Sequence, residues 1–129
     1  MRSKLGGRLL LAGAIALATL GIAPAAHAWG TGYYVAASCW RPWGSATLTW
    51  GFDAKNVTNV AGNTYPHYVY AYADLKYQGS RQDNIWEEGT GWVDGRKDRG
   101  GVTGGRVWSV FANASDGQTW LNGNECWVT

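Results

Sequence analysis

The sequence is poor in residues that carry covalent and metal chemistry. It has two cysteines and two histidines, and only His67 of the histidines lies beyond the first 28 residues. It contains no G-x-S-x-G motif, no phosphate-binding GK[ST] and no calcium-loop spacing. A lone imidazole is more typical of a structural histidine than of an acid, base or metal ligand. Glu87 and Glu88 are adjacent, so a strand would point them to opposite faces and they could not jointly flank a glycosidic bond. We therefore expect no enzymatic activity, no cofactor and no metal site.

Basic charge is also scarce once the start of the chain is set aside. Residues 1–28 combine a basic start, an apolar stretch and the small-residue site Ala-His-Ala, which predicts a cleavable signal peptide rather than a retained anchor. Its removal leaves eight basic residues against nine acidic ones, so the net charge changes from +2 to −1. No basic excess then remains for a nucleic acid, and we expect no membrane insertion. The sequence predicts a secreted, extracellular protein with a single all-β domain over residues 29–129.

The two cysteines, Cys39 and Cys126, lie near the start and the end of this domain. In an exported protein such a pair predicts a disulfide, in preference to two free thiols or a metal site. The bond would join the first strand to the last. Closing so long a loop should stabilise the fold by about 4 kcal/mol on the chain-entropy model.

No helical periodicity is present beyond the signal segment, and period-two alternation takes its place. Residues 65–77, YPHYVYAYADLKY, predict a long central strand. His67, Val69, Ala71, Ala73 and Leu75 would share one packed face. Tyr68, Tyr70, Tyr72, Asp74 and Lys76 would share the other, as a ladder of aromatic rings that ends in charges.

Further strands are predicted between turn-forming residues. They cover residues 33–39, 46–53, 85–88, 91–94 and 106–112, and a hairpin at Asn122-Gly123 pairs residues 119–121 with 125–128. Ala46, Leu48, Trp50 and Phe52 are expected to point inward. Residues 79–84 and the glycine-rich residues 94–106 are expected to be loops. Short strands at this spacing predict a small antiparallel β-sandwich or barrel.

All nine tryptophans and all seven tyrosines lie in residues 29–129, more than one small core can bury. Trp40, Trp43 and Trp127 are expected to pack around the disulfide. The tyrosine ladder could form an exposed contact site or lie beneath a second sheet. Trp29 follows the cleavage site with little local support, which favours an exposed anchor for a partner's groove. The predicted partner-binding residues are Trp29, Tyr33, Tyr34, Tyr68, Tyr70 and Tyr72.

Two functions from different classes fit these features. The first is a non-enzymatic adaptor that docks onto another secreted protein through residues 29–34 or the tyrosine ladder. The second is a carbohydrate-binding module that lays an exposed Tyr/Trp face along a polysaccharide. A small bacteriocin or an enzyme inhibitor is a further alternative.

The layout resembles that of known secreted proteins. An alanine-rich signal, AIALATLGIAPAAHA, precedes about a hundred tryptophan-rich, all-β residues with the pair Cys39 and Cys126. This layout is similar to that of small actinobacterial accessory proteins, among them adaptor subunits of umbrella-shaped antibacterial toxin particles, small bacteriocins and protease inhibitors. The cysteine placement is also similar to that of a family of cellulose-binding modules. The resemblance implies work inside a larger secreted assembly, such as a toxin complex used in interbacterial antagonism.

Overall fold

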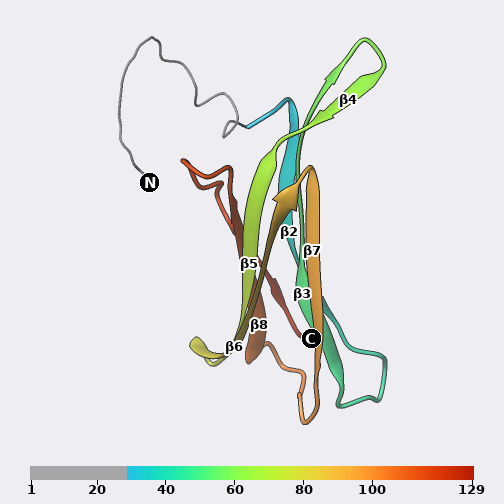
Figure 1. Cartoon of the computed structure of the whole chain (residues 1–129). Helices are drawn as coiled ribbons and strands as arrows, with labels where there is room; N and C mark the ends of the chain where they lie inside the picture. The colour runs from blue at the N-terminus through green and yellow to red at the C-terminus, as the bar shows by residue number, and fades with distance from the viewer. Residues whose placement is uncertain (1–28) are drawn as a thin grey trace.

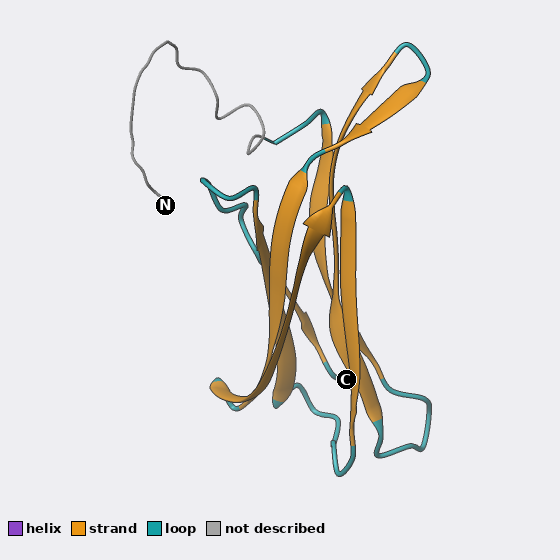
Figure 2. Ribbon diagram, viewed as in Figure 1, coloured by secondary structure: helices purple, strands orange, loops and turns teal. Residues whose placement is uncertain are grey.

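The described part of the chain forms two antiparallel sheets that pack face to face. The structure is a computed structural model that describes residues 29–129, and the predicted signal peptide, residues 1–28, lies outside this range. The strands are β2 (Gly32–Trp40), β3 (Leu48–Val60), β4 (Asn63–Pro66), β5 (Tyr68–Tyr77), β6 (Ser80–Thr90), β7 (Trp92–Arg99), β8 (Trp108–Ser115) and β9 (Asn124–Trp127). Figures 1 and 2 show the two layers and the long strands within them. The predicted all-β antiparallel sandwich is confirmed.

The first sheet is built around β3, and the second around β5 and β8. β3 pairs with β2 along one edge and with β7, followed by β4, along the other. The second sheet has the order β6-β5-β8-β9. We call these the β3 sheet and the β5 sheet. No helix in residues 29–129 has the length and apolar character needed to cross a membrane.

The core forms where the inner faces of the two sheets meet. Val69, Ala71, Ala73 and Leu75 of β5 are completely buried, as their period-two spacing predicts. On β8, Ala112 and Ala114 pair directly with Ala73 and Ala71. These small side chains leave room in the same cluster for the large rings of β3, Trp50 and Phe52. The predicted inward residues Leu48, Trp50 and Phe52 are therefore confirmed, whereas Ala46 is exposed and precedes the strand.

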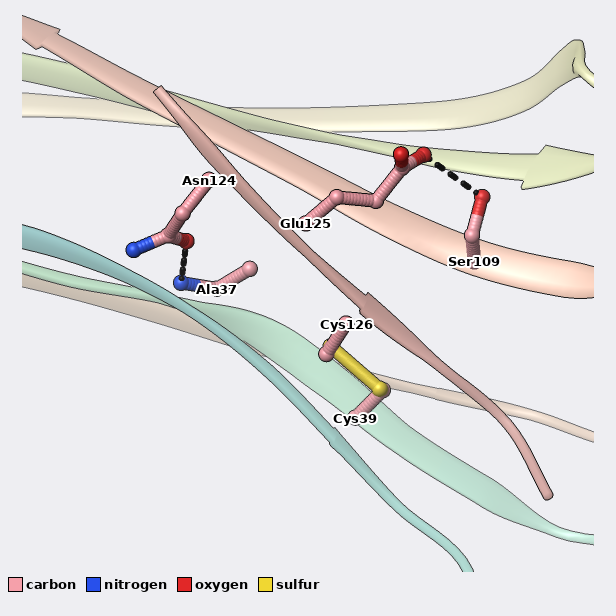
Figure 3. Close-up of a disulfide and its surroundings, with 6 residues drawn as sticks. All are labelled: Ala37, Cys39, Ser109, Asn124, Glu125 and Cys126. Atoms are coloured by element: carbon pink, nitrogen blue, oxygen red, sulfur yellow. Dashed lines mark hydrogen bonds between the residues drawn. A yellow bond between two sulfur atoms is a disulfide. The ribbon is translucent and has the colours of Figure 1, made fainter. Parts of the chain in front are cut away.

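One edge of the sandwich is closed by a covalent bond and an amide side chain (Figure 3). The predicted disulfide joins Cys39 of β2 to Cys126 of β9 and so links an edge strand of each sheet. Beside it, the Asn124 Oδ1 accepts a hydrogen bond from the Ala37 N–H at 2.6 Å. The Asn124 Nδ2 donates to the Val35 carbonyl at 2.7 Å. The amide thus pairs with the free edge of β2 as a neighbouring strand would.

A two-stranded arm extends from the β3 sheet, at the upper right of Figure 1. It consists of the last residues of β3 paired with β4, joined by a two-residue turn at Ala61 and Gly62. Both turn residues have positive φ, 52° and 81°, as a tight hairpin requires. Val60 and Tyr65 on the arm are exposed.

Two predicted loops are strands in the structure. Residues 79–84 were expected to be a loop, but β6 begins at Ser80; residues 94–106 were also expected to be a loop, but β7 extends to Arg99. β6 is an edge strand of the β5 sheet, and β7 is an edge strand of the β3 sheet. Strands in such positions can expose charged side chains on more than one side, which removes the apolar alternation from the sequence.

The end of the chain and the start of β5 also differ from expectation. The hairpin predicted at Asn122-Gly123 is wrong, because β9 pairs with Ser109–Ala112 of β8 and Trp120 bridges to Ser115 farther along the same strand. The strand predicted over residues 65–77 is interrupted at His67. The ring of His67 is half-buried beside β3, with Nε2 2.7 Å from the Thr58 Oγ1, and does not share the core face. β8 begins at Trp108, and Phe111 lies on its outer face.

Candidate binding site

The outer face of the β5 sheet contains a groove floored by the tyrosine ladder. Tyr68, Tyr70, Tyr72 and Asp74 point outward from β5 and are half-buried. Trp120 of the loop after β8 lines the hollow on the β8 side. On the other side of β5, Trp86 of β6 lies directly opposite Tyr72 and stacks on Tyr70. The hollow measures about 580 Å³ and is open to solvent. The sequence did not decide whether a second sheet covers the tyrosine ladder. In the structure the ladder is the floor of an open groove.

The aromatic rings of the groove support one another. The Tyr70 ring stacks on Trp86 with a centroid distance of 5.8 Å and an interplanar angle of 28°. Trp120 meets Tyr70 and Tyr72 edge to face, at 5.9 and 5.7 Å. Such contacts are favourable beyond simple burial and restrain the rings. Even so, Trp86 and Trp120 remain 53% and 54% exposed, so much of each indole is available to a ligand.

A polar cluster closes one end of the groove. Asp74 and Asn84 are cross-strand partners, and the Asn84 Nδ2 donates to the Asp74 Oδ1 at 2.9 Å. The Arg81 Nη1 lies 3.6 Å from the same carboxylate oxygen. This end therefore offers a carboxylate, an amide and a guanidinium within one small area, which together accept and donate hydrogen bonds.

The opposite end of the groove holds a phenol paired with a carboxylate. The Tyr68 hydroxyl donates to the Glu88 Oε1 at 2.8 Å. Burial, and then the hydrogen bond and charge of Glu88, raise the pKa of Tyr68 to about 12. Burial and the charge of Asp74 also raise the pKa of Tyr72. Both phenols therefore stay protonated, and able to donate, at and well above neutral pH.

A buried aspartate fixes the loop that places Trp120. The Asp116 Oδ1 accepts hydrogen bonds from the backbone N–H groups of Gln118 and Thr119, at 2.8 and 2.7 Å. The Asp116 N–H in turn donates to the Thr119 carbonyl at 3.2 Å. Asp116 and Gly117 therefore lie in a tight loop that is held by its own hydrogen bonds. Trp120 is thus held over the tyrosines by local hydrogen bonds.

The outer face of the β3 sheet carries a second, flatter set of exposed rings. Tyr34, Lys55 and Trp92 are in register across β2, β3 and β7. The Tyr34 and Trp92 rings meet edge to face at 6.5 Å, and the Lys55 Nζ lies 5.9 Å from the Trp92 centroid. Trp92 is 57% exposed. Trp40, 63% exposed, lies toward the other end of β2, and the Asp53–Arg96 ion pair at 2.8 Å lies between them.

The six predicted partner-binding residues fall on different surfaces. Tyr68, Tyr70 and Tyr72 line the groove, whereas Tyr33 and Tyr34 belong to β2 of the other sheet. A hollow of about 350 Å³ lies between these two tyrosines and the Leu121-Asn122 segment. Trp29 is not the freely exposed anchor that we expected, because it packs partly buried against the core with its ring 5.3 Å from Tyr33. Its proposed contact with a partner remains a prediction.

The expectation that three tryptophans pack around the disulfide is wrong. Trp40 and Trp127 are exposed because each is adjacent to a bridged cysteine, and neighbouring side chains on a strand point to opposite faces. Trp43 lies in the loop between β2 and β3 and is fully exposed.

Sequence reasoning missed several residues that complete the groove. Trp86, Trp120, Arg81 and Asn84 were not selected, although Trp86 and Asn84 have the same parity on β6. Their two-residue spacing was the signal in the sequence that both side chains point to the same face of the sheet. The pairing of Trp86 with Tyr72 could not be read from it, because it requires the β5–β6 register.

Within residues 29–129, no three His, Cys, Asp or Glu side chains come together as metal ligands would. No protein-family model, curated protein or solved structure matches the chain. Its function is therefore inferred from its own surfaces.

Proposed function

We propose that the chain is a secreted, non-enzymatic adaptor that docks onto another extracellular protein through the outer face of the β3 sheet. The observation that carries the proposal is the distribution of exposed rings over both outer faces of the sandwich. A protein with one small ligand needs a single set of such rings. Rings on opposite faces suit a protein that contacts one partner on each side.

The β3-sheet face has the composition of a protein interface. Tyr34 and Trp92 supply large, rigid contact area, and Lys55, Asp53 and Arg96 supply charges beside them. Tyrosine, tryptophan and arginine are the residues that protein interfaces favour and that dominate their binding energy. The hollow beside Tyr33 and Tyr34 could receive one side chain of the partner.

The arm lies at the same end of the sandwich and extends this surface. Val57, where the arm begins, is two residues beyond Lys55 on β3. An isolated two-stranded hairpin is only marginally stable in water. Val60 and Tyr65 alternate with the residues of the outer face, so a partner that wraps around the arm would cover them as well.

Export is the other part of the proposal. The Cys39–Cys126 disulfide is typical of oxidising, extracellular compartments and agrees with the signal peptide predicted over residues 1–28. The resemblance in layout to adaptor subunits of antibacterial toxin particles supports a place in such an assembly.

The test is affinity purification of the tagged protein from the culture supernatant of its producing organism. We expect another secreted protein to co-purify, and we expect Trp92→Ala to weaken its binding by at least about tenfold. Trp43→Ala is the matched control, since it removes an equally large exposed ring outside this face. Recovery of the chain only as a free monomer, or equal retention by Trp92→Ala, would contradict the proposal.

A further inference from the structure

The groove on the β5 sheet lies on the opposite face of the sandwich from the proposed docking surface. We propose that this groove binds a neutral saccharide, with the sugar rings lying along β5 between Trp86 and Trp120. The inference goes beyond the adaptor function and gives the second face a ligand. The adaptor would then connect its protein partner to a glycan.

The aromatic floor has the dimensions of a short saccharide segment. Outward residues on a strand are about 6.7 Å apart along its axis, so Tyr68 to Tyr72 spans roughly 13 Å, a length that a few pyranose rings cover. Trp86 and Trp120 stand on either side of this line and are each about half exposed. Flat, restrained rings are suited to the apolar faces of sugars because they lose little conformational freedom on binding.

The polar cluster at the end of the floor matches sugar hydroxyls, which both donate and accept hydrogen bonds. Asp74 accepts, Arg81 donates, and the Asn84 amide can do both. Tyr72, whose hydroxyl stays protonated, adds a further donor beside them. A ligand can reach these groups, because the Asp74 side chain is 18% exposed and the Arg81 side chain 63%.

The charges of the groove lie at its two ends, and each is engaged by a neighbouring group. Arg81 lies 3.6 Å from Asp74, and Glu88 accepts the Tyr68 hydroxyl at 2.8 Å. An anionic ligand would meet both carboxylates, and a cationic ligand would meet Arg81. The two carboxylates outnumber the guanidinium, which disfavours an anionic ligand, and the floor between the two ends, Tyr68 to Tyr72, is uncharged and suits a neutral one.

The backbone disfavours an extended peptide as the occupant. β5 is paired with β6 on one side and with β8 on the other, so its backbone hydrogen-bonding groups are already used. A peptide could not add to it as a strand, which is the usual way for an extended chain to bind a sheet. The groove therefore offers side chains only, as a saccharide site requires.

The experiment is a pull-down with insoluble cellulose, chitin, xylan and β-1,3-glucan, followed by titration of soluble oligosaccharides of the retaining polymer. We expect retention on at least one polymer and a change in tryptophan fluorescence on titration. Tyr70→Ala and Trp120→Ala should each weaken binding by at least about tenfold. Trp92→Ala and Trp43→Ala, which remove rings outside the groove, should bind as the wild type does.

Two variants guard against a loss of fold. Trp120 lies beyond the end of β8 and outside the core, so Trp120→Ala should remain folded although it loses two edge-to-face contacts. Asp74→Asn keeps the shape of the polar cluster while removing its charge. Failure of the wild type to bind any of the four polymers would overturn the proposal. Undiminished binding by both Tyr70→Ala and Trp120→Ala would also overturn it. Co-purification of the protein partner is unaffected by these outcomes, so the adaptor function is tested separately.

Discussion

At the scale of single residues, Asn56 ties three separate segments to β3. It is completely buried, and its Oδ1 accepts from the Gly30 N–H at 2.7 Å while its Nδ2 donates to the Tyr68 carbonyl at 2.9 Å. Its backbone groups bond to Gly91 and to His67. Asn56 therefore holds the N-terminal segment, the start of β5 and the β6–β7 turn at one point. The end of the groove that begins with Tyr68 depends on this contact.

We predict that Asn56→Ala lowers the free energy of unfolding by about 2–4 kcal/mol, since it leaves buried polar partners unsatisfied and opens a cavity. Asn63→Ala, in the exposed arm, should change stability by no more than about 0.5 kcal/mol. Urea unfolding followed by tryptophan fluorescence measures both. Equal midpoints for the two variants would contradict this reading of Asn56.

The Tyr68–Glu88 pair makes a prediction in alkaline solution. Because folding raises the pKa of Tyr68 from 10.0 to about 12, the folded state holds this proton more tightly than the unfolded state does. The resulting stabilisation is fully present below pH 10 and is lost as pH rises from about 10 to about 12. Glu88→Gln removes the charge but keeps an acceptor, so the pKa of Tyr68 should fall yet remain above 10, because burial is the larger cause.

Absorbance of tyrosinate, or the ring signals of Tyr68 in NMR spectra, follows this titration. Glu87→Gln is the matched control, since Glu87 and Glu88 point to opposite sides of β6. An unchanged Tyr68 titration in Glu88→Gln would show that the carboxylate has no part in the shift.

At the scale of elements, sequence patterns predicted strands wherever one face is apolar. β5 follows its period-two alternation because Val69, Ala71, Ala73 and Leu75 all point into the core. β6 and β7 were missed in part because they carry charges on exposed positions. An edge strand is held by backbone hydrogen bonds, which form with almost any side chain. Its sequence can therefore resemble that of a loop.

Half of the groove could likewise be predicted. The tyrosine ladder follows from parity within one strand, which is a local property. Trp86 and Trp120 come from other segments, and their positions depend on strand register and on the Asp116 loop. The Asn122-Gly123 signal predicted the wrong pairing because β8 offered the last strand a longer partner than residues 119–121 did. The turn-forming residues Asn122 and Gly123 therefore did not determine which strand β9 pairs with.

The arm gives a prediction at this scale. Ala61 has φ of 52°, a left-handed conformation that costs a residue with a Cβ about 1–2 kcal/mol. Ala61→Asn should slow amide exchange in the arm and stabilise it by about 0.5–1 kcal/mol, because asparagine tolerates this conformation. Gly62→Ala, at φ of 81°, should have the opposite effect. Faster exchange in Ala61→Asn would contradict the expectation.

At the scale of the whole molecule, the two sheets are joined at both edges. Cys39–Cys126 and Asn124 join β2 to β9. At the other edge, the chain turns directly from β6 into β7, and the Lys97 Nζ lies 3.0 Å from the Asp83 Oδ2. A backbone hydrogen bond from Asn84, and then the contact with Lys97, lower the pKa of Asp83, so this ion pair persists into acid solution.

We predict that the double variant Cys39→Ser, Cys126→Ser loses about 4 kcal/mol of unfolding free energy, since the bond closes a loop with a sequence separation of 87 residues. Asn124→Ala should lower the free energy of unfolding by about 1–2 kcal/mol, because two backbone groups of β2 lose their partner. Urea unfolding with and without reductant measures these losses. Equal stability of the oxidised and reduced protein would contradict the first expectation.

The two closed edges have a mechanical consequence for a protein held between ligands on its opposite faces. Tension between those ligands would act to peel one sheet from the other. Peeling begins most easily at an open margin, yet here one margin is closed by sulfur–sulfur linkage and the other by the continuous main chain of β6 and β7. The sandwich would therefore transmit a pull from face to face without separating at either margin.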